Sequence, residues 1–138
     1  MLGTNDSKES NWNEDLYTQD LEALTTAYMH LKSTPRVYLM IPPHVEEFNK
    51  NVQKFGILIP VVNFQIPKII RNLARKLQIG VIDMSKAFID LSDPHREDWE
   101  KGGIYYWTGD GVHPNDKTYE KLAYMIAANI DEASGTTA

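Results

Sequence analysis

The sequence predicts an α/β fold in which helices cover a small parallel β-sheet. Amphipathic stretches with helical spacing alternate along the 138 residues with short apolar runs rich in strand-forming side chains. The order helix–strand–helix–strand–helix needs crossover connections, which give parallel strands with helices on the faces of the sheet. We therefore expect one domain over residues 1–131 and a disordered polar tail over residues 132–138.

The first half of the chain contains one predicted helix and one predicted strand. The helix spans about residues 13–32, begins at Asn13 as its N-cap and ends before Pro35. Five side chains form its predicted inward face: Leu16, Leu21, Leu24, Tyr28 and Leu31. The run 36–41 is apolar on both faces, which is typical of a buried parallel strand. A long loop is expected over residues 44–63.

The next predicted helix spans about residues 64–78, with Pro67 in its first turn and Gly80 as its C-terminal cap. Its apolar stripe consists of Ile66, Ile69, Ile70, Leu73 and Leu77. A short strand at residues 81–84 follows this helix.

The last third of the chain is expected to hold a short helix, a loop and a long helix. The short helix covers about residues 86–91 and the loop covers residues 92–115. Asn115 is expected to cap the final helix, which ends near residue 130. Its predicted inward side chains are Tyr119, Leu122, Ala123, Ile126 and Ile130.

The composition excludes several classes of protein. The net charge is −5 without a basic stripe, so we expect no nucleic-acid partner. The absence of cysteine excludes disulfides, thiolate metal sites and cysteine nucleophiles. No apolar run approaches the roughly 20 residues that a membrane span needs, and residues 1–10 show no signal-peptide pattern. The compartment stays unknown.

The strongest local signal is the run Asp110-Gly111-Val112-His113-Pro114-Asn115. A carboxylate three residues before a histidine can accept the imidazole Nδ1–H, which leaves Nε2 as a base. The same run also reads as a solvated turn before a capped helix, and Asp-x-x-His is common by chance. The run therefore makes Asp110 and His113 candidates for catalysis without deciding between the two interpretations.

A second motif, Gly3-Thr4-Asn5-Asp6, follows what reads as the end of a strand at Met1-Leu2. Gly3 permits a tight backbone turn, after which the Asn5 amide can donate a hydrogen bond beyond the edge of the sheet. Such a donor stabilises a tetrahedral oxyanion by about 2.7–4 kcal/mol. The alternative is an Asx turn, which is the commoner role of Asn-Asp near a glycine.

In this order, the two motifs resemble blocks of the SGNH (GDSL-like) hydrolases. Gly3-Thr4-Asn5-Asp6 matches the third block, Gly-x-Asn-Asp, and Asp110, His113 and Pro114 match the fifth, Asp-x-x-His followed by Pro. The phrase Leu2–Lys8, followed by Asn11-Trp12, resembles the sialate O-acetylesterase-like or carbohydrate esterase branch. The resemblance extends from residue 1 to about residue 130.

The resemblance implies a three-layer α/β/α fold with a flavodoxin-like parallel sheet, and ester hydrolysis without metal or cofactor. His113 would take the proton of a nucleophilic serine and pass it to the leaving alcohol, while Asp110 orients the imidazole. Asn5 would donate to the oxyanion, in a loop that Gly3 and Asp6 support. The expected substrate is an O-acyl ester, in particular an O-acetyl group on a carbohydrate.

The sequence departs from the family pattern because it contains no Gly-Asp-Ser block and no counterpart of the second-block glycine. Its six serines all lie in other contexts: Ser7, Ser10, Ser33, Ser85, Ser92 and Ser134. Ser7 lies nearest the motif, but this branch commonly has a serine there without using it as nucleophile. We expect an incomplete sheet without its N-terminal strands, a chain that is inactive alone, and a nucleophile from a missing N-terminal segment or a complementing chain.

Three further residues are candidates for substrate binding: His44, Trp107 and Trp12. His44 follows the carboxyl end of a predicted strand, where ligands of parallel sheets bind, although a plain surface-loop histidine is the commoner alternative. Trp107 and Trp12 flank the two motifs and can stack on a sugar ring or pack internally. The spacing of Asp93 and His95 is not typical of metal ligands, so no metal is expected.

A rival hypothesis is a non-catalytic, degenerate SGNH domain that binds a ligand or partner. The missing serine favours it, whereas the retained Asp110, His113 and Asn5 favour turnover. A third hypothesis, a flavodoxin-like phosphate or nucleotide binder, lacks the glycine-rich loop after a strand that phosphate binding needs.

Overall fold

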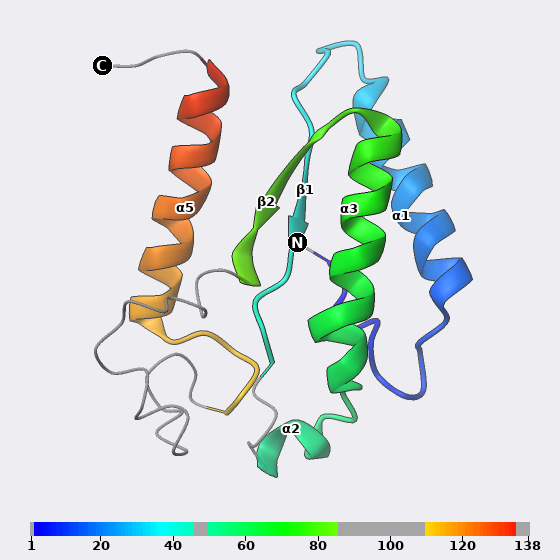
Figure 1. Ribbon diagram of the computed structural model, residues 1–138, viewed down its shortest axis with the longest axis vertical. Helices are drawn as coiled ribbons and strands as arrows, with labels where there is room; N and C mark the ends of the chain where they lie inside the picture. Colours follow the sequence, from blue (N-terminus) through cyan, green and yellow to red (C-terminus); the bar gives the residue numbers. More distant parts are fainter. Residues whose placement is uncertain (1, 46–49, 86–109, 135–138) are drawn as a thin grey trace.

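A computed structural model of the chain describes residues 2–45, 50–85 and 110–134. Its elements in chain order are α1 (Glu14–Met29), β1 (Tyr38–Ile41), α2 (Lys50–Lys54), the π-helix η1 (Val61–Gln65), α3 (Ile66–Leu77), β2 (Gly80–Asp83) and α5 (Asp116–Ser134). Figure 1 shows the two strands between α3 and α1 on one side and α5 on the other. The predicted α/β fold is confirmed.

The two strands form a parallel pair in which Tyr38 lies opposite Gly80 and Ile41 opposite Asp83. Side chains alternate between the faces of a strand, and β1 uses both faces. Leu39 and Ile41 belong to the core cluster with α1 and α3, whereas Tyr38 and Met40 pack against a second cluster that includes Leu122 of α5. This alternation gives three layers, with helices on both faces of the sheet.

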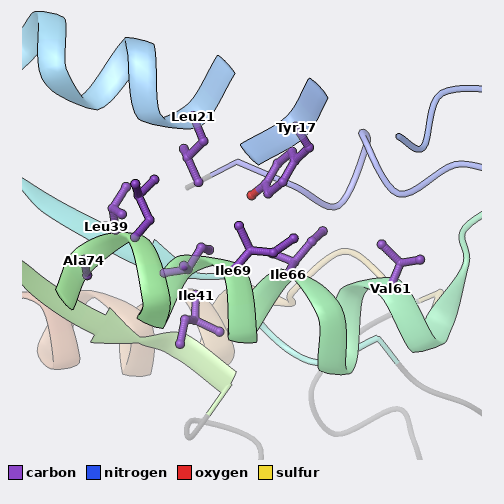
Figure 2. Close-up of a cluster of buried hydrophobic side chains, with 10 residues drawn as sticks. Tyr17, Leu21, Leu39, Ile41, Val61, Ile66, Ile69 and Ala74 are labelled. Carbon is purple, nitrogen blue, oxygen red and sulfur yellow. The ribbon is translucent and has the colours of Figure 1, made fainter. Parts of the chain in front are cut away.

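The main core lies between β1, α1 and α3 and is drawn in Figure 2. The predicted stripe of α3 is confirmed, because Ile66, Ile69, Ile70 and Leu73 are buried and Leu77 is partly buried. Each fully buried side chain of this kind contributes about 1.5–3 kcal/mol. Pro67 lies in the first turn of α3, as predicted, but the π-helix η1 leads directly into α3, so the helical backbone begins before this turn.

Asparagine caps fix where α1 and α5 begin, as the sequence predicts. The Asn13 Oδ1 accepts the Leu16 N–H at 3.0 Å, and the Asn115 Oδ1 accepts the Thr118 N–H at 3.0 Å. Each cap satisfies a backbone donor that the helix itself leaves free. The backbone entering both helices is therefore held by local hydrogen bonds.

The predicted inward face of α1 is wrong in part. Leu21 is buried, but Leu16, Leu24, Tyr28 and Leu31 are exposed in the described structure. Tyr17 and Thr25, one turn to either side of Leu21, are buried with it. The Thr25 hydroxyl donates to the Leu21 carbonyl at 2.6 Å, so a polar side chain can occupy the buried stripe.

The predicted face of α5 is also shifted. Leu122 is buried and Ile126 is partly buried, but Tyr119, Ala123 and Ile130 are exposed. Thr118 is fully buried instead, and its Oγ1 bonds with the Asn115 Oδ1 at 3.1 Å. The cap thus satisfies a hydroxyl that hydrophobic periodicity assigns to the surface.

Several predicted boundaries need correction. The loop expected over residues 44–63 contains α2 and most of η1. Gln78, with a left-handed φ of 56°, caps α3 in place of Gly80. Gly80 is instead the first residue of β2. A glycine fits there because a Cβ would lie 2.6 Å from Cδ1 of the Tyr38 ring. Helix α5 continues to Ser134, beyond the expected end near residue 130.

An apolar groove of about 200 Å³ runs along the edge of β1 that faces away from β2. Its lining combines consecutive residues of β1 with side chains of α1 and residue 2: Leu2, Leu21, Leu24, Thr25, Tyr28, Val37, Tyr38, Leu39, Met40 and Ile70. Within the described ranges β1 pairs with β2 alone, so this edge carries unpaired backbone groups. The expectation of an incomplete sheet is met.

None of the helices in the described ranges combines the length and apolar character that crossing a bilayer requires. The predicted helix at 86–91 and the loop 92–109 lie outside the described residues.

Candidate active site

The Gly3–Ser7 loop turns at the amino end of the described chain, and the turn depends on Gly3. Its φ is +133°, which disfavours any side chain, and its carbonyl accepts the Ser7 N–H at 2.9 Å. A Cβ on Gly3 would lie 3.0 Å from Ile66 Cδ1 and 3.1 Å from Tyr17 Oη. The loop is thus seated directly on the main core.

Asn5 lies at the tip of this loop with an exposed side chain. Its carbonyl accepts the Lys8 N–H and the Asn11 Nδ2, so local hydrogen bonds hold its backbone. Among the residues that the structure describes, its side-chain amide has no hydrogen-bond partner. The amide therefore remains available to donate to a ligand.

Asp6, next to Asn5, is exposed, and its negative charge influences Tyr17 of the main core. Burial, and secondarily the Asp6 carboxylate, raises the pKa of Tyr17 above its usual value. The neutral Tyr17 hydroxyl donates to the Leu2 carbonyl at 3.3 Å. Asp6 thus lies near Tyr17, the core residue whose hydroxyl holds the start of the loop at Leu2.

Ser7 is fully buried, and its hydroxyl donates to the Thr4 carbonyl at 2.7 Å. This bond closes the loop between Thr4 and Ser7. The contact is structural, and it occupies the hydroxyl proton within the loop.

The loop before α5 forms the expected pair. The carboxylate Oδ2 of Asp110 lies 2.7 Å from Nδ1 of His113, while its Oδ1 accepts the N–H groups of His113 at 2.8 Å and Val112 at 3.0 Å. Gly111 supports this compact turn with a φ of +89°. One carboxylate therefore fixes both the backbone of the loop and the imidazole.

This hydrogen bonding governs the ionisation of Asp110. Partial burial favours the neutral carboxyl, but the hydrogen bonds from His113 and Val112 outweigh it and hold the pKa of Asp110 below its usual value. With Nδ1 facing an ionised carboxylate, the proton of a neutral imidazole belongs on Nδ1. Nε2 then carries the lone pair that a general base needs.

One segment, residues 55–58, contacts both loops. Lys8 forms an antiparallel bridge with Ile57, and the Leu58 N–H donates to the Ser7 carbonyl at 3.0 Å. On the other side, the Phe55 ring meets the His113 ring edge-on, with centroids 5.8 Å apart and planes at 85°. The loops of Asn5 and His113, over a hundred residues apart in sequence, are therefore connected through the same short segment.

The base of the His113 loop packs on a small apolar cluster of Val45, Val52, Ile57 and Val62, which Val112 contacts. Asn63 of η1 completes this support, since its side chain accepts the Val45 N–H at 2.9 Å and donates to the Val45 carbonyl at 3.0 Å. π-Helical turns often occur at functional sites. Here the turn presents a buried amide to the loop that follows β1.

The substrate-binding candidates fall in different places. His44 is half-buried beside Val45, in the segment after the carboxyl end of β1. Trp12 is half-buried against the main core, with its ring 5.4 Å from that of Tyr17, so packing accounts for its position. Trp107, Asp93 and His95 lie outside the described residues.

Phe55 and Asn63 were not identified from the sequence. Lys54-Phe55-Gly56 reads as an ordinary turn, and Asn63 falls in a segment predicted as loop. A weak signal for Asn63 is its position as a single polar residue between apolar neighbours, just before the α3 stripe. No local pattern links Phe55 with His113.

A family model for the GDSL-like lipase/acylhydrolases matches residues 1–126. The chain belongs to this family. The resemblance to the SGNH (GDSL-like) hydrolases is thus confirmed. The match includes both the Gly3–Asp6 and the Asp110–His113 motifs.

Two solved structures share the fold of this GDSL-like chain. A lipase/acylhydrolase from Enterococcus faecalis is 20% identical, with a TM-score of 0.66 over 95% of this chain and 58% of that one. A structure described as "Peptidoglycan O-acetylesterase in action" is 17% identical, with a TM-score of 0.71 over 98% of this chain and 37% of that one. This chain thus spans less than two thirds of either protein. No curated protein matches it by sequence.

Proposed function

We propose that this GDSL-like chain supplies the base, the orienting carboxylate and an oxyanion donor for serine-type hydrolysis of O-acyl esters. The observation that carries the proposal is the 2.7 Å contact between Asp110 and His113 Nδ1, which directs Nε2 away from the carboxylate. The exposed amide of Asn5, unpartnered within the described residues and on a loop connected to the same segment 55–58, supports it.

In the proposed reaction, His113 Nε2 takes the proton of a serine hydroxyl as its oxygen bonds to the acyl carbon. The carbonyl oxygen becomes an oxyanion that Asn5 stabilises, and the imidazolium faces the ionised Asp110. The imidazolium then protonates the leaving alcohol as the ester C–O bond breaks. Water, deprotonated by the same Nε2, releases the acid and restores the serine.

We propose further that the nucleophile comes from residues outside these 138. The sequence has no Gly-Asp-Ser, and the hydroxyl of Ser7 is buried and engaged with Thr4. Ser85 is also buried and donates to Asp83. The apolar groove along the free edge of β1 supports the proposal, because an additional strand could pair there, either from an N-terminal segment or from a complementing chain.

The proposed substrate is an O-acetyl ester on a carbohydrate. The Leu2–Lys8 phrase resembles the sialate O-acetylesterase-like or carbohydrate esterase branch, and one structural neighbour is described as a peptidoglycan O-acetylesterase. His44 follows the carboxyl end of β1, where ligands of parallel sheets bind, and is our candidate for contacting a sugar hydroxyl.

The experiment compares ester hydrolysis by this chain with hydrolysis by the chain extended through its upstream reading frame. The 138 residues alone should hydrolyse p-nitrophenyl acetate about six orders of magnitude more slowly than the active enzyme, as expected without the nucleophile. The extended chain should be active and label with a serine-directed fluorophosphonate, and His113→Ala should abolish turnover. Vigorous, His113-dependent turnover by the 138 residues would contradict the proposed source of the nucleophile.

The second candidate function is a non-catalytic binding domain, which the absence of Gly-Asp-Ser favours. It predicts that neither chain hydrolyses O-acetylated glycans, whereas both bind them. Binding that survives His113→Ala without any turnover would support this candidate over the enzyme.

A further inference from the structure

The segment 55–58 is the structural link between the two halves of the proposed site. On one side it forms an isolated antiparallel bridge with residues 7–9, in which the Glu9 N–H donates to the Gly56 carbonyl at 2.9 Å and the Leu58 N–H donates to the Ser7 carbonyl at 3.0 Å. On the other side it ends in the Phe55 ring, which meets His113. This segment is therefore in contact with both loops.

His113 needs such a contact because its own loop fixes the imidazole incompletely. The His113 side chain is 68% exposed, and its bond to Asp110 constrains the direction of Nδ1. One hydrogen bond still permits the ring to tilt about the Nδ1–carboxylate axis. An aromatic ring at 5.8 Å and 85° restricts that tilt, since edge-to-face packing has a preferred geometry.

We propose that the segment Phe55–Leu58 is the positioning element of the site, and that Phe55 is the residue that orients His113 toward the acyl carbon. The inference rests on the proposed function and deepens it. Phe55 touches neither serine nor substrate in this account; it acts through His113. Gly56, with a φ of +67°, lies between Phe55 and the bridging residue Ile57.

The test measures the His113 ring by NMR in the 138-residue chain, without relying on activity. Phe55→Leu should remove the ring-current shifts of the His113 carbon-bound protons and broaden or abolish the Nδ1–H signal of the Asp110 pair. Phe55→Tyr keeps the ring and should retain both. Phe64→Leu is the matched control, because Phe64 is 61% exposed on η1 and belongs to neither loop of the site.

His30 serves as an internal reference for folding, since its Nδ1 lies 2.7 Å from the Thr26 carbonyl at the end of α1. Its signals should stay unchanged in all variants. His113 signals that are the same in Phe55→Leu as in the parent chain would overturn the proposal. Equal changes in Phe55→Leu and Phe64→Leu would also overturn it, because the effect would then not arise from the ring contact.

Kinetics in the extended, nucleophile-containing chain give the second readout. Phe55→Leu should lower kcat by roughly 10- to 100-fold with KM unchanged, as a misaligned base affects the chemical step. An unchanged kcat would overturn the positioning role. Failure of the proposed function would appear differently, as the absence of His113-dependent turnover in the parent chain while the NMR contrast between variants persists.

Discussion

Replacing Gly3 with alanine tests how the oxyanion loop is seated on the core. Two costs add at this position. A φ of +133° strains an L-residue by about 1–3 kcal/mol, and the new Cβ would lie 3.0 Å from Ile66 Cδ1 and 3.1 Å from Tyr17 Oη, where overpacking adds about 1–3 kcal/mol. Partial relaxation should leave a loss of about 2–4 kcal/mol from a free energy of unfolding that is typically about 5–15 kcal/mol.

Urea denaturation measures this loss. With a slope of about 2 kcal/mol per molar urea, the midpoint should fall by about 1–2 M without a change in slope. Gly56→Ala is the matched control, since Gly56 also has a positive φ (+67°) but a Cβ added there would meet nothing within 4 Å. The control should lose about 1–2 kcal/mol from backbone strain alone. A Gly3→Ala midpoint equal to or above that of Gly56→Ala would refute the packing argument.

Three further outcomes follow from the described contacts. Asn13→Ala should lower the free energy of unfolding by about 1 kcal/mol in the same urea assay, because the Leu16 N–H loses its cap; a neutral effect would mean that water replaces the cap. Asn63→Ala should cost about 2–4 kcal/mol, because two buried backbone groups of Val45 lose their partners; a loss below about 1 kcal/mol would exclude that role. The pKa of Asp110 in the folded chain is held below its usual value near 3.8, which the unfolded chain keeps. The hydrogen bonds of its carboxylate therefore stabilise the fold fully above the unfolded-state pKa. This stability is lost as the pH falls through the lower folded-state pKa. Stability measured from about pH 5 to about pH 2 should therefore fall less in Asp110→Asn than in the parent chain, and equal slopes would contradict this.

Local patterns predicted the parts of the fold that local physics determines. Asn13 and Asn115 were identified as caps because a short polar side chain before an apolar period satisfies free backbone donors. The buried stripe of α3 was also predicted from a local pattern, because its apolar side chains recur at helical spacing. The Asp110–His113 contact also forms within four residues, so the sequence alone predicts it.

The remaining features depend on contacts between distant segments. Thr25 and Thr118 are buried because nearby acceptors satisfy their hydroxyls, which hydrophobic periodicity does not register. Gly80 was expected to cap α3, but the Tyr38 ring of the neighbouring strand requires a glycine there. Phe55 and Asn63 act on residues 58 and 18 positions away, so no local spacing could identify them.

The central claim is that the Asn5 amide and the His113 imidazole face one acyl group. Because the chain has no cysteine, Asn5→Cys with His113→Cys creates a single pair of thiols for a short bismaleimide. Asn5→Cys with Ile130→Cys is the control. The Asn5 loop contacts residues 55–58, which directly follow α2. The carboxyl end of α5, which carries Ile130, lies at the opposite end of the molecule from α2 in Figure 1. The account predicts rapid intramolecular cross-linking of the 5/113 pair and little of the 5/130 pair; equal or absent cross-linking of 5/113 would contradict it.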